Sequence, residues 1–110
     1  LARFGQLYLD NGMANGQQIV PAEWVAASVT APAKGSPNLF IEGFYRNLWW
    51  GSFRPNRIRD DFYANGHFGQ RIYISPDKNL VIVRLGSNTA DVDWTMLLGS
   101  IADAWKHPEP

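Results

Sequence analysis

The segment from residue 68 to residue 85 constrains the fold most, because it holds two apolar runs joined by a turn sequence. Phe68 to Ser75 and Leu80 to Leu85 are rich in β-branched and aromatic residues, which favours strands. Between them stands PDKN, whose proline and flanking polar residues are typical of a β-turn. The pattern predicts an antiparallel hairpin. The nearly continuous apolar run LVIVRL further predicts that the second strand is covered on both faces.

Three stretches around this hairpin have the apolar spacing of helices. The first opens the chain and is expected to end near Asp10, since Asn11 and Gly12 readily adopt the left-handed conformation that stops helices. A second, short helix is expected in VPAEWVAASV, with Pro21 in its first turn. The third is expected in DVDWTMLLGSIADAWK, with Asp91 as its N-cap. Its predicted apolar stripe consists of Trp94, Leu97, Leu98, Ile101 and Trp105.

The remaining segments predict one further strand and several loops. APAKGSPNLF and RPNRIRDD are expected to be connections, and the aromatic stretch FYRNLWWGSF is expected to be a single strand. The sum is an α+β domain over residues 1–110, with an antiparallel sheet of about three strands and flanking helices. Because the chain begins at Leu1, inside a helical pattern, we expect it to be a piece of something longer with an incomplete sheet.

The composition argues against several classes of partner. Ten basic and ten acidic residues give a formal net charge of zero, whereas a nucleic-acid-binding surface is strongly basic. Arg54, Arg57 and Arg59 cluster, but Asp60 and Asp61 follow at once, which favours a solvated loop over an anion site. The sequence has no cysteine and no apolar run of about eighteen residues, so we expect neither disulfides nor a membrane span.

Few residue patterns indicate catalytic chemistry. Ser75 and Lys78 match S-x-x-K, but Pro76 and Asp77 between them predict a hairpin turn rather than the helix start that a catalytic pair needs. Two Y-x-N matches, which begin at Tyr45 and Tyr63, are expected to arise by chance. Metal and cofactor sites are not expected. The only histidines are His67 and His107, and the acidic residues are better explained as loop charges and a helix cap.

The stretch GHFGQ, residues 66–70, is unusual at the head of a predicted strand. Glycine weakens a strand because it has no side chain to pack, so Gly66 and Gly69 need a reason. Either the segment is a β-bulge with a half-buried His67, or it leaves a bare backbone edge on which a flat ligand lies. In the second case the N–H after Gly69 is free to donate to an oxygen of that ligand. The residues alone favour the bulge.

Two other functions stay open on the residues alone. Trp49, Trp50 and Tyr73 would form an aromatic platform for a sugar or peptide in a non-catalytic binding module, although core packing is the more ordinary role of such residues. A truncated sheet would also leave unpaired strand edges, which favours self-association.

The order of these segments resembles a known family. LARFGQLYLDNGMANGQQIVPAEWV, the aromatic LWWGSF, and YANGHFGQRIYISPDKNLVIVRLGSN followed by a terminal helix are similar to the C-terminal part of the serine β-lactamase and penicillin-binding-protein-like hydrolases. The class C β-lactamase-related branch, with esterases and 6-aminohexanoate-dimer hydrolases, is the most similar. The resemblance covers nearly the whole chain and implies a β-lactamase/transpeptidase-like fold. It is compatible with a periplasmic or secreted location.

The resemblance also implies roles for residues 67–70. The family's K-T-G motif lies on a strand beside the active site. Its positions match His67, Phe68 and Gly69, which would contact the substrate, and the backbone N–H of Gln70 would belong to the oxyanion hole. Histidine in place of lysine is mostly neutral near pH 7, which suits a neutral ester or amide better than a β-lactam carboxylate. The family's S-x-x-K and Y-x-N motifs come earlier in its chains and are absent here, so the isolated chain is expected to be inactive.

Overall fold

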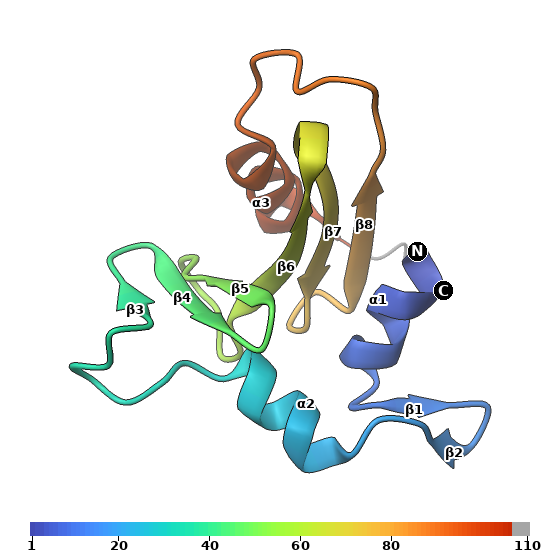
Figure 1. The fold of residues 1–110 in the computed structure, drawn as a ribbon. Helices are drawn as coiled ribbons and strands as arrows, with labels where there is room; N and C mark the ends of the chain where they lie inside the picture. The colour runs from blue at the N-terminus through green and yellow to red at the C-terminus, as the bar shows by residue number, and fades with distance from the viewer. Residues whose placement is uncertain (107–110) are drawn as a thin grey trace.

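A six-stranded antiparallel sheet forms the centre of the computed structural model, which describes residues 1–106 (Figure 1). Its strands lie side by side in chain order: β3 (Leu39–Phe40), β4 (Gly43–Arg46), β5 (Trp49–Ser52), β6 (Asp61–Gly66), β7 (Gln70–Ser75) and β8 (Leu80–Arg84). A separate two-stranded sheet pairs β1 (Met13–Ala14) with β2 (Gln17–Gln18). Three helices complete the chain: α1 (Ala2–Leu9), α2 (Ala22–Val29) and α3 (Trp94–Ala104). The expected α+β class is therefore confirmed.

The expected number of about three strands is wrong in three places: β3 forms at the end of the expected connection APAKGSPNLF, the expected strand FYRNLWWGSF is two strands, and β6 also forms. Asn47 and Leu48 both have positive φ, at 50° and 71°, and so turn the chain between β4 and β5 where one continuous strand was expected. Strand β6 also forms, although Ala64, Asn65 and Gly66 have low strand propensity, because it pairs on both edges. The predicted β7–β8 hairpin is confirmed, with Ser75 opposite Leu80 at the turn.

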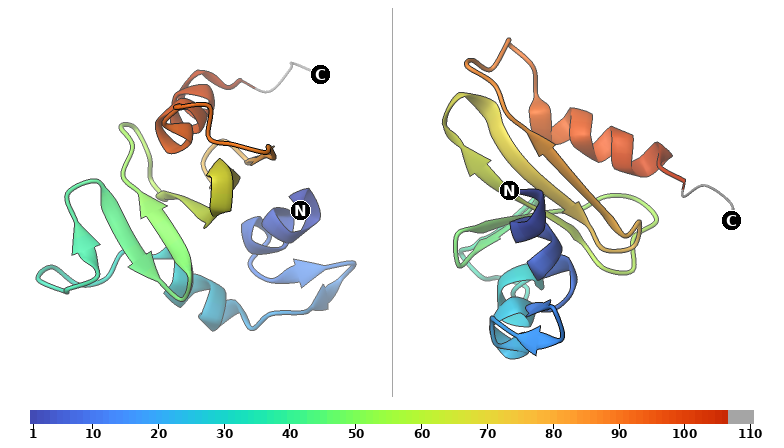
Figure 2. Two further views of the ribbon diagram at one scale, coloured as in Figure 1. Left: turned by 45° about the horizontal axis from the view of Figure 1, so that its top comes forward. Right: turned by 90° about the vertical axis from the view of Figure 1, so that its right-hand side faces the viewer.

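Helices α1 and α3 lie on opposite sides of the β6–β8 part of the sheet, as the right-hand view of Figure 2 shows, and α2 packs against β4 and β5. On the α1 side, Trp49, Phe62, Ile72 and Ile74 form a buried cluster against which Tyr8 and Val81 pack. On the other side, Tyr73 packs with Leu98 and Ala102 of α3, and Leu80 and Ile82 join this second cluster. Residues of β8 therefore pack into both clusters, one on each face of the strand, as LVIVRL predicted. Each residue of β8 nevertheless remains half-buried.

The predicted limits of the helices are mostly confirmed. Helix α1 ends at Leu9, and Asn11 and Gly12 follow with φ of 57° and 87°. The N-cap of α3 is Asp93 rather than the predicted Asp91, since the Asp93 side chain accepts a hydrogen bond from the N–H of Met96 at 3.1 Å.

The predicted apolar stripe of α3 is only partly buried. The buried face of the helix consists of Leu98, Gly99 and Ala102. Two residues of the predicted stripe, Leu97 and Ile101, are about two-fifths exposed, at 42% and 41%. Small residues at the centre of this face let the helix approach the sheet, because a Cβ on Gly99 would lie 3.1 Å from the hydroxyl of Tyr73.

Within residues 1–106, no helix has the length and apolar character that crossing a membrane requires.

Candidate functional site

The tip of the β6–β7 hairpin contains every site residue that the sequence predicted. Gly66 pairs with Gln70 at the end of the ladder, and His67–Gly69 form a tight 3₁₀ turn between them. Phe68 has φ 63° and Gly69 has φ 80°, so the chain reverses through two consecutive left-handed residues. The expectation that the strand begins at Phe68 is therefore wrong, because β7 begins at Gln70.

The tip is open on one side and closed on the other. Gly66 and His67 are exposed, and Phe68 is 51% exposed with its ring 4.0 Å from the imidazole of His67. Gly69 is buried instead, since a Cβ there would lie 2.8 Å from Cδ1 of Trp94. The absent side chain at Gly69 thus makes room for α3, a reason that no sequence pattern indicated.

Two side chains brace the turn from β8 and the loop after it. Arg84 donates a hydrogen bond to the carbonyl oxygen of Phe68 at 2.8 Å, and its guanidinium carbon lies 4.1 Å from the ring centroid of Trp94. The Gln70 side chain accepts from the N–H of Gly86 at 2.8 Å and donates to the carbonyl of the same residue. The backbone of the tip is therefore held in one conformation by neighbours from distant parts of the chain.

A small hollow lies beside the open side of the tip. It has a volume of about 180 Å³, and its lining includes Ala64, Gly66, Gln70 and Leu85. The main-chain N–H of Gln70 sits at the border between ladder and turn. The hollow is therefore bordered by a turn whose backbone is fixed and by the last pair of the β6–β7 ladder.

Arg54, Arg57 and Asp61, the first residue of β6, belong to a buried polar network, whereas Arg59 stays exposed beside Asp77, as expected of a solvated loop. Asp61 is fully buried and accepts hydrogen bonds from Tyr73 at 2.6 Å, Ser75 at 2.8 Å and Arg57 at 2.9 Å. Arg57 also donates to Asp103 on α3 at 2.9 Å. The surrounding polar residues satisfy the buried carboxylate, so this network stabilises the sheet and its contact with α3.

The network shifts the pKa of several of its members. A hydrogen bond to Asp61 raises the pKa of Arg57, and a hydrogen bond from Arg54 lowers the pKa of Asp103. Burial raises the pKa of Tyr73, and its hydrogen bond to Asp61 adds to this effect. No sequence pattern marked Asp61, since its partners come from both sides in the chain.

The other sequence matches have structural roles. The S-x-x-K match forms the β7–β8 turn, as predicted, with the Ser75 hydroxyl buried on Asp61 and the Lys78 ammonium 3.3 Å from the carbonyl oxygen of Asp103. Tyr45 and Tyr63 lie on β4 and β6. His107 lies outside the described residues.

The predicted aromatic platform of Trp49, Trp50 and Tyr73 does not form. Trp49 is 4% exposed beneath Phe4 and Tyr8 of α1, and Tyr73 is fully buried beneath α3. Trp49 and Trp50 are successive residues of one strand, so they point to opposite faces of the sheet.

No family model matches this chain, but several known proteins resemble it. The 6-aminohexanoate-dimer hydrolase of Paenarthrobacter ureafaciens is 31% identical over 93 residues, which are 79% of this chain and 23% of that protein. An uncharacterised protein of Alkalihalophilus pseudofirmus is 35% identical over 94 residues, which are 76% of this chain and 27% of that protein.

A solved structure agrees with these relatives. The putative 6-aminohexanoate-dimer hydrolase from Bacillus anthracis matches with a TM-score of 0.61 and 31% identity, over 93% of this chain and 26% of that one. The chain thus spans about a quarter of the length of each of these three proteins.

Proposed function

Because the chain belongs to the β-lactamase-like hydrolase family, we propose that it forms the C-terminal part of a serine hydrolase that cleaves ester or amide bonds. The family's serine and lysine of S-x-x-K, and its Y-x-N motif, are absent from these 110 residues. In the proposed enzyme they come from a preceding segment, and the serine attacks the carbonyl carbon to form an acyl-enzyme. By itself this chain is not expected to turn over substrate.

The contribution of this chain is the β6–β7 tip as one wall of the active site. The N–H of Gln70 donates to the oxyanion of the tetrahedral intermediate, and the substrate lies against His67 and Phe68. The braced turn carries the proposal, because a donor that is fixed in advance needs no reorganisation when negative charge develops. Gly69 contributes only its main chain to this wall, because the side of its α-carbon where a Cβ would stand is directed toward Trp94.

His67 favours neutral substrates in this proposal. Its imidazole is exposed beside the ring of Phe68, at the position that matches the lysine of K-T-G. Histidine carries less positive charge than lysine near neutral pH, so it attracts a substrate carboxylate less strongly. We therefore propose simple esters or amides as substrates ahead of β-lactams.

Removal of one main-chain N–H tests the proposal. In a hydrolase that includes this chain, replacement of Gln70 by the corresponding α-hydroxy acid exchanges the amide N–H for an ester oxygen and keeps the side chain. We expect kcat on a chromogenic ester to fall by about 10²- to 10³-fold, as for the loss of one oxyanion donor.

The matched control is the same exchange at Ile41, a 95% exposed turn residue, which is expected to leave kcat unchanged. Equal kcat for the Gln70 and Ile41 variants would refute the oxyanion role. Strong turnover by the isolated 110-residue chain would refute the proposal that the nucleophilic serine comes from a preceding segment.

A further inference from the structure

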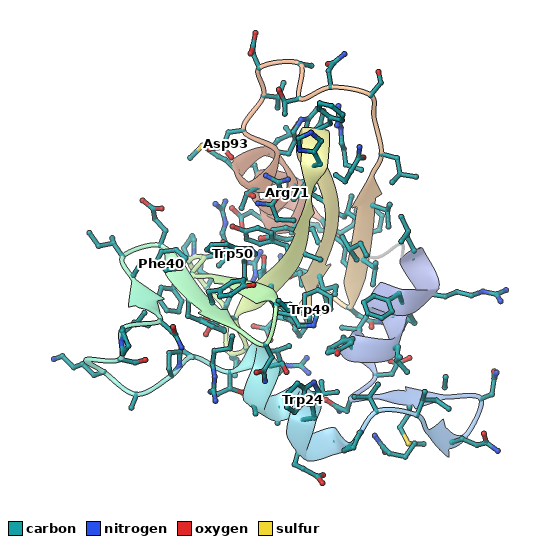
Figure 3. All side chains as sticks on the ribbon, viewed as in Figure 1. Trp24, Phe40, Trp49, Trp50, Arg71 and Asp93 are labelled. Carbon is teal, nitrogen blue, oxygen red and sulfur yellow. The ribbon has the colours of Figure 1, made fainter. Side chains whose placement is uncertain are left out.

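A groove lies on the α3 side of the sheet, on the face opposite the α1 cluster. It has a volume of about 350 Å³ and runs between Phe40 and Glu42 at one end and Asp93 and Thr95 of the α3 start at the other. Strands β5 and β6 form its floor through Gly51, Ser52 and Tyr63. Figure 3 shows Phe40, Trp50, Arg71 and Asp93 around this region.

Aromatic rings line this groove and stay partly open to solvent. Phe40 and Phe53 are 38% and 39% exposed, and Tyr63 is half-buried. Trp50 holds two of these rings in place, because it stacks on Tyr63 at 6.5 Å and meets the ring of Phe40 at 6.0 Å. The ring surfaces are therefore arranged before any ligand arrives.

The groove also carries negative charge. Among the described residues that line it are two carboxylates, Glu42 and Asp93, and neither lysine nor arginine. The Asp93 carboxylate caps α3. Within residues 1–106, the Glu42 side chain makes no hydrogen bond and no ion pair, so its charge is available.

A fixed cation indicates which end of the groove would hold a bound positive charge. The Arg71 guanidinium lies 5.8 Å from the ring centroid of Tyr63 and donates to the Thr95 hydroxyl at 3.2 Å. A second cation would be repelled at that end. The end formed by Phe40 and Glu42 combines ring surface with an unpaired carboxylate, which suits an organic cation.

We propose that this groove binds an alkylammonium group, with the aliphatic chain on the aromatic floor and the ammonium between Glu42 and the ring of Phe40. The site lies on the other side of the sheet from the hollow at the β6–β7 tip, and it does not depend on the hydrolase reaction. The ligand class is therefore a primary amine at the end of an aliphatic chain.

Titration of the 110-residue chain with n-hexylammonium at pH 7, followed by amide chemical shifts in NMR spectra, tests the proposal. We expect saturable shifts centred on Glu42, Gly51 and Thr95. Since an exposed cation–π contact and a single surface ion pair are each weak, n-hexanol should bind about three- to tenfold more weakly than n-hexylammonium. Raising the salt concentration should reduce this difference.

A charge-neutral variant and its matched control complete the test. Glu42→Gln should weaken n-hexylammonium binding about threefold and leave n-hexanol binding unchanged. Glu23→Gln alters another exposed acid, on α2, and should change neither. Equal binding of amine and alcohol, shifts centred outside the groove, or unchanged amine affinity in Glu42→Gln would each overturn the proposal.

Discussion

At the scale of single residues, the same amino acid is required for different reasons at different places. Gly35 and Gly69 both have positive φ, at 91° and 80°. A Cβ on Gly35 would meet no atom within 4 Å, whereas one on Gly69 would approach Trp94 and Arg84. Both positions thus need a residue that tolerates positive φ, but only at Gly69 is there no space for a side chain.

This difference gives a prediction for Gly69→Ala. A left-handed alanine costs about 1–2 kcal/mol at either position, and at Gly69 the clash with Trp94 and Arg84 adds to it. The free energy of unfolding in urea should therefore fall by more than about 2 kcal/mol in Gly69→Ala and by only about 1–2 kcal/mol in Gly35→Ala. Equal losses in the two variants would show that Trp94 moves aside without cost.

At the scale of elements, turn chemistry decided the strand count. Type I′ turns need two central residues with positive φ, and Asn-Gly is their preferred sequence. The β1–β2 turn follows this rule with Asn15 and Gly16, but the β4–β5 turn has Leu48 in the second position. A leucine gives no sequence signal of a left-handed turn, so two strands were predicted as one.

Leu48→Gly should stabilise the chain. Leu48 is 79% exposed and so loses little burial, while glycine removes the strain of φ 71°. After the greater flexibility of glycine in the unfolded chain is subtracted, we expect a gain of about 0.5–1 kcal/mol in the free energy of unfolding. Ile41→Gly is the control, because Ile41 is also exposed, at 95%, but has no positive φ and should gain nothing. A loss of stability in Leu48→Gly would contradict the strain argument.

At the scale of the whole molecule, one polar network joins the sheet to α3. Arg57 contacts Asp61 on β6 and Asp103 on α3, and Arg54 also pairs with Asp103.

Self-association stays a prediction. Strands β3 and β8 are the edges of the large sheet within the described residues, and Met96 of α3 is an apolar side chain that is 61% exposed.

The network predicts a loss of stability at both ends of the pH range. The lowered pKa of Asp103 favours folding above about pH 3.9, its ordinary value, and this contribution is lost as the pH falls through the folded-state pKa. The raised pKa of Tyr73 favours folding below about pH 10, and this contribution is lost progressively above it.

Urea midpoints measured across the pH range check this prediction. Asp103→Asn should flatten the acid limb of the stability curve and leave the alkaline limb intact, and Tyr73→Phe should do the reverse. An alkaline limb that is unchanged in Tyr73→Phe would assign the loss of stability to other groups.

The sequence by itself determined the local features: the α+β class, the helix that ends before Asn11 and Gly12, and the β7–β8 hairpin around PDKN. Each depends on residues within a few positions of one another, where periodicity and turn chemistry operate. The tertiary structure alone decided that Asp61 is buried in an ion pair with Arg57. It also decided that Phe68 adopts a left-handed conformation and that its carbonyl oxygen accepts a hydrogen bond from Arg84. Those outcomes depend on contacts between segments that only the completed sheet brings together, so no local pattern predicts them.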